Sequence, residues 1–297
     1  MLRAKRKSRG DQVFGIVNGV LLAIMAFLVL YPLYFSLIAS FSSPNAVYQG
    51  RVIFLPADIT LQGYEKIFTD PSIWTSYLNS IVYTLVGTLC NLVFTIPLAF
   101  ALSRREFPLH GVYMKLMAFT MYFYGGIIPL YFVVKDLHLL DTMWSLILPT
   151  VIATYNLIIA RSFFISNIPE ELKEAAFLDG CGYIRFFFSV VMPLSKAIVA
   201  VMALFYAARL WNGYFEALIY MNTESKFPLQ LILRTILIES QNALQDAGEA
   251  TTVKDKQELV NLLKYGCVIV SSVPMLLFYP FVQKYFVKGV MIGAVKG

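Results

Sequence analysis

Long apolar stretches alternate with shorter polar segments along the whole chain. Each stretch is about 20 residues, enough for one helix to cross the hydrocarbon core of a bilayer. The pattern therefore predicts an all-α polytopic membrane protein with six transmembrane helices. The expected spans cover residues 13–38, 78–102, 112–134, 142–164, 190–211 and 263–287.

The third expected span contains residues that weaken a regular helix. Gly125, Gly126 and Pro129 all lie inside it. A membrane helix tolerates such residues where neighbouring helices cover the freed backbone groups. We therefore expect a kink in this span.

The composition supports the membrane assignment. The 297 residues are 58% hydrophobic and 14% charged, with a mean hydropathy of +0.68, whereas a soluble domain carries about 25% charged residues. The net charge of +6 does not require a nucleic-acid partner, because basic residues of membrane proteins gather on the cytoplasmic side. Cys90, Cys181 and Cys267 are isolated, which indicates neither a disulfide framework nor a metal site.

Basic residues set the expected orientation. Residues 1–12 form a basic arm, and the apolar run behind it is too long for a signal-peptide core, so we interpret it as a retained span with a cytoplasmic N-terminus. Residues 13–297 then form one membrane domain. Four crossings return the chain to the cytoplasm at residues 165–189. Residues 212–262 form a long outer loop, expected to be helical over 229–238 and exposed over 241–258, and the C-terminus with Lys284, Lys288 and Lys296 lies inside.

One charged segment stands out between the fourth and fifth spans. It predicts a short helix after Pro169, with Asn167 as the N-cap and Glu170 at the positive end of the helix dipole. Gly180 and Gly182 are expected to end this helix. A short amphipathic helix outside the membrane either lies on the lipid interface or docks into a partner, and both alternatives stay open at this point.

The sequence shows no catalytic constellation. His110 and His138 fall in loops expected on opposite sides of the membrane, and the motifs H-E-x-x-H, G-x-S-x-G and G-x-x-x-x-G-K-[ST] do not occur. We therefore expect a protein that is not an enzyme and that binds no metal or cofactor itself. If ATP drives its work, the nucleotide site lies on another chain.

Polar side chains near or inside the spans are candidates for a solute path. Tyr155 and Asn156 fall in mid-span, and because buried polar groups need partners, they should face the bundle interior or such a path. Arg209, Trp211 and Asn212 lie near the outer end of the fifth span. Interfacial anchoring is the simpler explanation for these three, and a sugar-binding pore mouth is the alternative.

The charged residues in the spans also bear on how transport could be driven. Lys115 and Lys196 lie near cytoplasmic span ends, where they can snorkel to water. The spans hold no series of buried acids of the kind that a proton-driven carrier uses. This argues against a self-sufficient secondary transporter, which we keep as the alternative function, and a structural scaffold is a more remote one.

Three short motifs follow one another in the cytoplasmic segment: Glu174-Ala175-Ala176, Asp179-Gly180 and Val191-Met192-Pro193-Leu194. Their spacing resembles the EAA signature of permease subunits in binding-protein-dependent ABC importers. Nearly the whole chain is similar to carbohydrate-uptake permeases, and most to the LplC and YtcP branch related to the maltose permease MalG. The other similar segments are Tyr31-Pro32-Leu33-Tyr34, Asn79-Ser80, Ala101-Leu102-Ser103-Arg104, Trp211-Asn212-Gly213-Tyr214-Phe215, Phe227-Pro228-Leu229-Gln230 and Lys284-Tyr285-Phe286-Val287-Lys288-Gly289.

The resemblance implies a MetI-like fold in the bacterial cytoplasmic (inner) membrane. It also implies pairing with a second homologous permease, two ATPase subunits that bind ATP and Mg²⁺, and an extracytoplasmic solute-binding protein. The EAA loop would be the coupling helix that docks into an ATPase, and an ordinary surface helix is the alternative. Carried over by position, the coupling residues are Glu174, Ala175, Ala176, Asp179 and Gly180.

The branch further implies a substrate class. Its members take up oligosaccharides released from polysaccharides, and in some members these are acidic, such as alginate or pectin fragments. Arg209, near the expected outer mouth, would suit a uronate.

Overall fold

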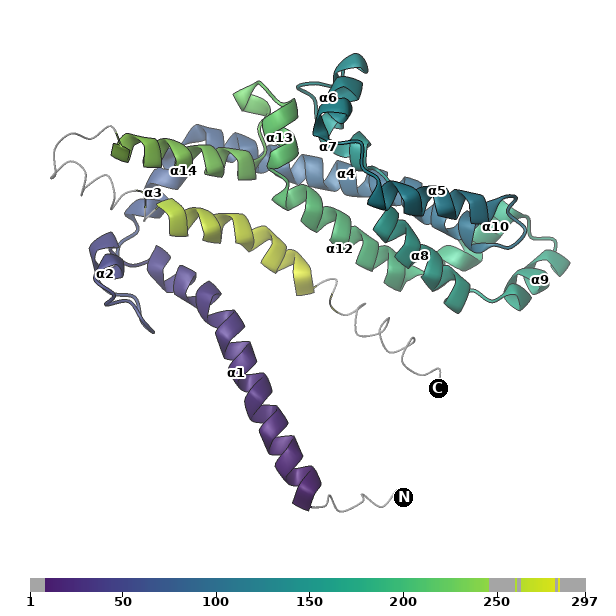
Figure 1. Cartoon of the computed structure of the whole chain (residues 1–297), viewed down its shortest axis with the longest axis horizontal. Helices are drawn as coiled ribbons and strands as arrows, with labels where there is room; N and C mark the ends of the chain where they lie inside the picture. Colours follow the sequence, from purple (N-terminus) through teal and green to yellow (C-terminus); the bar gives the residue numbers. More distant parts are fainter. Residues whose placement is uncertain (1–8, 246–259, 261–262, 281–282, 284–297) are drawn as a thin grey trace. The chain divides into compact units, whose positions relative to one another are not determined.

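The computed structural model is built from helices (Figure 1). It describes residues 9–245, 260, 263–280 and 283; the expected basic C-terminus and most of the N-terminal arm lie outside these residues. Within the described part no strand occurs, apart from an isolated bridge between Ser42 and Ile59. The expected all-α class is confirmed.

The helices follow one another with short connections. In chain order they are α1 (Arg9–Ser40), α2 (Pro44–Tyr48), α3 (Gln62–Thr69), α4 (Pro71–Ser103), α5 (His110–Tyr122), α6 (Ile127–Asp136), α7 (Trp144–Ile147), η1 (Leu148–Thr150), α8 (Thr154–Asn167), α9 (Glu170–Leu178), α10 (Tyr183–Phe186), η2 (Phe187–Val191), α11 (Met192–Leu194), α12 (Lys196–Asn212), α13 (Phe215–Tyr220), η3 (Glu224–Lys226) and α14 (Leu229–Gln245). A further helix covers Leu263–Pro280.

The chain divides into two compact units. One consists of residues 1–69 and 236–271, the other of residues 70–235 and 272–297. In the first unit, a small core forms around Ile38, Ala46 and Val52, whereas most of the apolar length of α1 is exposed. The second unit contains every candidate site residue named above.

Helices that are long and apolar enough to cross a membrane take two forms. Three are continuous, namely Gly10–Ser40, α4 and Leu263–Pro280. Three more are bent pairs: α5 and α6 meet at 114°, the 144–150 helix and α8 at 53°, and the 183–194 helix and α12 at 79°. With each bent pair taken as one crossing, the described residues hold up to six spans, the number expected.

The bend of the third span lies where its glycines are. α5 ends at Tyr122 and α6 begins at Ile127. Gly126 between them has φ +94°, a conformation that residues with a Cβ rarely adopt. The expected kink is confirmed, and at 114° it is a full break in the helix (Figure 1).

The fifth span differs from its expected course. Its apolar run was expected to begin near Val190, but the helical segment begins at Tyr183 and turns at Ser195. Residues 187–191 form a π-helical turn. Pro193 cannot donate a backbone hydrogen bond to the preceding turn, so the helix is weakest there and bends.

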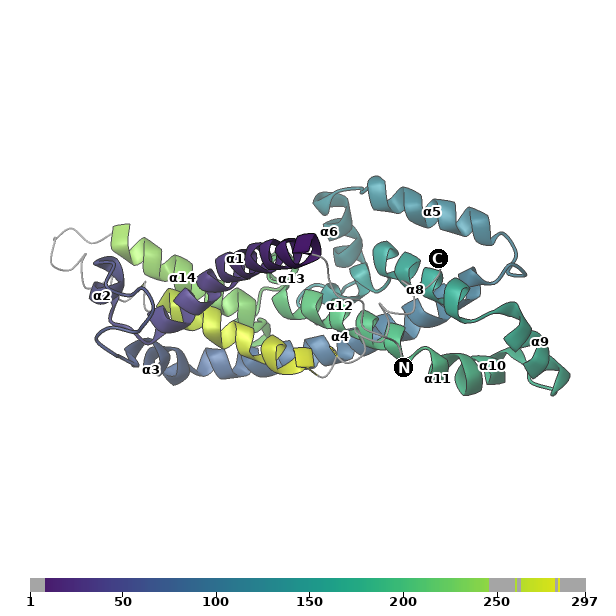
Figure 2. The same ribbon diagram turned by 90° about the horizontal axis from the view of Figure 1, so that it is seen from below.

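Helix α4 is the central element of the second unit. It runs side by side with α8 and α12 (Figure 1 and Figure 2). A Cβ on Gly87 would stand 2.6 Å from Leu210 Cδ1, so a small residue is what allows this close helix packing. The fully buried Tyr206 of α12 bonds to Thr95 Oγ1 of α4 at 2.7 Å and accepts the Ala153 N–H at 3.3 Å. One phenol thereby joins three segments of the core.

Candidate functional site

The short helix α9 begins and ends largely as its sequence indicates. It starts directly after Pro169 with two glutamates in its first turn. It ends in a Schellman motif: Gly180 has φ +78°, the Cys181 N–H donates to the Ala176 carbonyl at 2.9 Å and the Gly180 N–H to Phe177 at 3.0 Å. The expected stop at Gly180 is confirmed.

Two of the expected caps are wrong. Asn167 is the last residue of α8, and its Nδ2 donates to the Phe163 carbonyl at 3.0 Å instead of capping α9. Proline at 169 imposes an extended conformation on the residue before it, so α8 has to end before α9 can begin. Gly182 has extended backbone and stands before α10, so it starts the next helix and Gly180 alone ends α9.

One face of α9 is open to solvent. Glu171, Glu174, Ala175 and Leu178 are exposed at the i, i+3, i+4, i+7 spacing that aligns residues on one side of a helix. Leu178 is 90% exposed. A helix that leaves an apolar side chain so open beside acidic ones has the form of a surface that binds a partner.

The expected coupling residues divide between this face and the interior. Glu174, Ala175, Asp179 and Gly180 are all exposed. Ala176 is half-buried against the core of its own chain, together with Leu172 and Phe177. The expected set omits Leu178, although it lies one turn after Glu174 and its spacing alone would place it on the same face.

A buried arginine holds the junction of α8 and α9. Arg104, the residue after α4, is 6% exposed. Its Nη1 and Nη2 each donate to the Ile168 carbonyl at 3.1 Å, and Nη2 also donates to Phe164 at 3.1 Å. The Phe164 carbonyl also accepts the Ile168 N–H at 3.1 Å. The guanidinium thus adds a second donor there and supplies a donor to the Ile168 carbonyl beyond the end of α8.

A second set of charges holds α9 itself. The Lys173 ammonium, on a side chain 11% exposed, bonds to Glu106 Oε1 and lies 3.6 Å from Glu170 Oε1. Tyr183 donates to the other oxygen of Glu106 at 2.5 Å. The bond to Glu106 raises the pKa of Lys173, and the bonds from Lys173 and Tyr183 lower the pKa of Glu106. We call Arg104, Glu106, Lys173 and Tyr183 the α4–α9 network.

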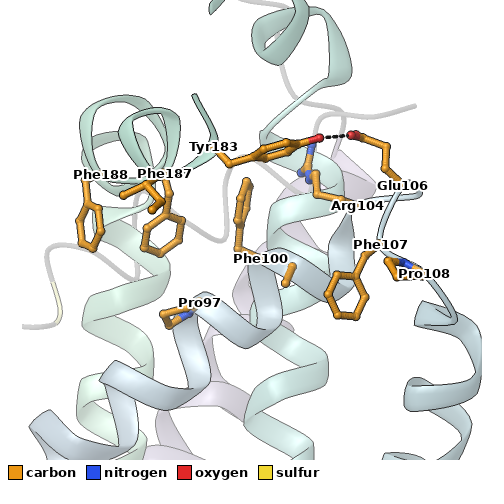
Figure 3. A pocket seen from close by; sticks show the side chains of 11 residues that line it. Pro97, Phe100, Arg104, Glu106, Phe107, Pro108, Tyr183, Phe187 and Phe188 are labelled. Atoms are coloured by element: carbon orange, nitrogen blue, oxygen red, sulfur yellow. Dashed lines mark hydrogen bonds between the residues drawn. The ribbon is translucent and has the colours of Figure 1, made fainter. Parts of the chain in front are cut away.

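A cavity of about 370 Å³ opens beside this network. Figure 3 shows Tyr183 reaching across toward Glu106, with aromatic rings along the walls. Arg104 and Glu106 are its charged lining residues, and both already have protein partners. The remaining lining is apolar or aromatic: Pro97, Phe100, Ala101, Phe107, Pro108, Tyr183, Ile184, Phe187 and Phe188.

The five candidate solute-path residues do not meet in one place. Asn156 is 8% exposed and faces the interior, whereas its neighbour Tyr155 is 60% exposed. Trp211 is 3% exposed and packs edge-on against Tyr77 with 5.7 Å between ring centroids, so it is a core residue of this chain. Asn212 is exposed and donates to a backbone carbonyl of its own helix at 2.8 Å.

Arg209 is paired within the chain. Its Nη2 lies 3.1 Å from Glu216 Oε1 of α13. It lines a cavity of only about 20 Å³, the size of one water molecule. Its Nη1 is buried and has no hydrogen-bond partner in the described part of the chain, so the guanidinium is only partly paired.

The first part of the expected outer loop is ordered around a carboxylate. Asp141 accepts the N–H groups of Asn222 and Thr223, each at 3.0 Å, the Thr223 hydroxyl at 2.7 Å and the Lys226 ammonium at 2.7 Å. These bonds, that of Lys226 first, hold the pKa of Asp141 well below its usual range.

The same segment is bound to α4. Asn79 Nδ2 donates to the carbonyls of Ser225 and Phe227 at 2.8 and 3.1 Å, and the Leu229 N–H donates to Ser80 Oγ at 2.7 Å. Asn79-Ser80 and the stretch from Phe227 are two of the segments similar to carbohydrate permeases. Sequence reasoning placed them in separate regions, and the structure brings them into contact.

Comparison with known proteins gives matches over most of the chain. The family described as "Binding-protein-dependent transport system inner membrane component" matches residues 71–292. Protein LplC of Bacillus subtilis (strain 168) is 37% identical over 296 residues, covering 100% of this chain and 99% of LplC. The polygalacturonan/rhamnogalacturonan transport system permease protein YtcP of the same strain is 39% identical over 287 residues, covering 97% of this chain and 99% of YtcP.

A solved structure also matches this chain over most of its length. It is described as the crystal structure of a bacterial ABC transporter involved in the import of the acidic polysaccharide alginate. One of its chains superimposes with a TM-score of 0.80 at 36% identity, covering 95% of this chain and 100% of that one.

Proposed function

Because this chain belongs to the family of binding-protein-dependent transport system inner membrane components, we propose that it is the permease subunit of an ABC importer for oligosaccharides. It is a multi-pass inner-membrane protein and a transporter component, not an enzyme. Its proposed partners are a second homologous permease, two ATPase subunits that bind ATP and Mg²⁺, and an extracytoplasmic solute-binding protein. The observation that carries the proposal is the exposed face of α9.

In this proposal α9 is the coupling helix. Glu174 can accept charge-assisted hydrogen bonds from a basic partner, and Ala175 lets the partner's backbone come close. Leu178 supplies the apolar anchor, and burying such a side chain contributes about 1.5–3 kcal/mol. Asp179 and Gly180 form the exposed turn that ends this surface.

The spans would respond to movement of α9 by alternating access. ATP-driven closure of the ATPase dimer displaces α9, and the helices joined to it reorient so that the path opens to the other side. The bends of the spans provide places where part of a span can turn without the whole helix moving.

The proposed substrate is an oligosaccharide, with acidic fragments of the alginate or pectin type as the specific case. The support is the similarity to YtcP and to a chain of the alginate importer. Arg209 pairs with Glu216 through Nη2 and keeps Nη1 without a partner, so this residue decides neither for nor against an acidic sugar. In this proposal the binding protein selects the acidic sugar.

Leu178→Asp tests the coupling role. The chain is co-expressed with its second permease and ATPase, and ATPase recovery and uptake of oligogalacturonate are measured in vesicles. The variant should insert normally and lose most of the ATPase, since an aspartate cannot replace an apolar anchor. Leu55→Asp is the matched control, because Leu55 is also exposed, at 74%, but lies in the loop between α2 and α3.

Two results would count against the proposal. Full ATPase recovery with Leu178→Asp would remove α9 as the docking surface. Uptake by the chain alone, purified as a functional homo-oligomer without any ATPase, would favour the secondary transporter instead.

A further inference from the structure

Helix α4 is held by polar contacts at both ends. It is a continuous helix of 33 residues, about 50 Å long at 1.5 Å per residue. The α4–α9 network lies at its C-terminal end, and Asn79 and Ser80 near its start hold the segment 222–229. The contacts to α9 come from the turn that directly follows α4, whereas those to the segment 222–229 come from α4 itself.

Helix α9 needs support from outside itself. It has nine residues, whereas isolated helices shorter than about 12 residues are marginal in water. Leu172, Ala176 and Phe177 pack against the core, but the opposite face is exposed. The bond of Lys173 to Glu106 joins residues 67 positions apart, and Glu106 lies three residues beyond the end of α4, in the turn that follows it.

The buried charges favour a positioning role over a purely stabilising one. A lysine or arginine that is nearly buried loses hydration, and a paired buried charge adds little net stability over an apolar residue. Arg104 and Lys173 nevertheless both occupy such sites. What the pairs do provide is a fixed geometry between α4, the end of α8 and α9.

We propose that Arg104, Glu106 and Lys173 are positioning residues that make α9 and α4 move as one body, so that a displacement of α9 reaches the segment 222–229. The proposal rests on the coupling role of α9. It adds the connection through which that helix acts on the far end of the unit. In this arrangement Glu106 and Lys173 fix α9 to α4, and Arg104 fixes the α8–α9 junction to it.

A distance measurement tests the one-body movement directly. Spin labels are placed at Glu171 of α9, which has no assigned contact with the ATPase, and at Arg105, both exposed. The complete importer is used, with Cys90, Cys181 and Cys267 replaced by alanine. The distance between the labels should be the same without nucleotide and with ATP bound. In the Glu106→Gln, Lys173→Met double variant its distribution should broaden or shift. A distance that changes with nucleotide in the intact network would overturn the proposal.

Transport per ATP hydrolysed gives a second readout, one that a role in folding alone would not move. Glu106→Gln leaves the nearly buried Lys173 charge without its main partner, and Lys173→Met removes the link from the side of α9. Each should lower this ratio by about tenfold while the ATPase is still recovered. The double variant should be no worse than the worse single variant, since both remove one link. The pair would only maintain the fold of α9 if the losses of the two single variants add up in the double variant. The same would follow if ATPase recovery falls as much as transport does.

Two neighbouring arginines provide the matched control. Arg104 is buried and bonded to two carbonyls, whereas Arg105 is exposed and has no side-chain bond among the described residues. Arg104→Gln should lower the transport ratio and Arg105→Gln should not, and equal behaviour would contradict the assignment. If instead Leu178→Asp keeps its ATPase, the coupling role of α9 fails, and the label distance still decides whether α9 and α4 move together.

Discussion

The end of α9 offers a matched pair of glycines for a stringent prediction. Gly180 and Gly182 are both exposed, and a Cβ at either position would meet no atom within 4 Å. They differ in backbone conformation, since Gly180 has φ +78° and Gly182 has φ −80°. Any difference between Gly180→Ala and Gly182→Ala therefore reports the backbone conformation and not crowding.

The size of the effect follows from that conformation. An alanine in the left-handed region costs about 1–2 kcal/mol, whereas alanine at an extended position is neutral or slightly favourable. A cost of this size changes the ratio of the closed to the opened α9 terminus by about 5–30-fold. Gly180→Asn should recover part of the loss, because asparagine tolerates left-handed backbone better than alanine does.

Hydrogen exchange measures this ratio locally. The amide of Cys181, which donates to Ala176 in the Schellman motif, should exchange about 5–30-fold faster in Gly180→Ala and unchanged in Gly182→Ala. ATPase recovery should likewise be lower in Gly180→Ala than in Gly182→Ala. If both alanine variants exchange and assemble alike, the left-handed turn does not set the end of α9, and the reasoning is refuted.

Two further predictions concern the polar contacts of the core and of the segment 222–229. Tyr206→Phe leaves the buried Thr95 hydroxyl and the Ala153 N–H without a partner, so it should cost about 1–3 kcal/mol of folding stability. The Tm of the detergent-solubilised protein should fall. The additional substitution Thr95→Val should make this fall smaller, because it removes one of the two unpaired groups. The depressed pKa of Asp141 means that its contribution is present above the ordinary aspartate pKa and is lost only as the pH falls through the lower folded value. Lowering the pH from 7 to about 4 should therefore leave the Thr223 amide protected from exchange, whereas Asp141→Ala, which removes its acceptor, should expose it at both pH values. Loss of protection at pH 4 without the substitution would contradict this.

Local patterns in the sequence predicted the elements that local forces determine. Apolar runs of bilayer length gave the helices, and the glycines at 125 and 126 gave the break of the third span. Gly180 gave the end of α9, because a left-handed turn is a property of a few consecutive residues.

Contacts between distant parts of the chain could not be predicted in this way. The charges of Glu106 and Lys173 are separated by 67 residues, and nothing in either neighbourhood indicates the other. The same holds for Arg209 and Glu216, which lie only seven residues apart but on two helices joined by a turn. The order of the segment 222–229 could not be predicted either, because it comes from Asp141 and α4 and not from the composition of the segment. Most of the stretch 241–258, expected to be exposed, lies outside the described residues.

The break between α5 and α6 has a consequence for what can surround this chain. Between Phe123 and Gly126 the backbone leaves the helical bonding pattern, and residues 121–125 are exposed on the isolated subunit. Hydrocarbon cannot solvate unpaired peptide groups, each of which would cost several kcal/mol there. At membrane depth this stretch must therefore meet water or another polypeptide, whereas continuous helices such as α1 can face acyl chains along their length. The break thus marks a place on the second unit that lipid alone cannot cover.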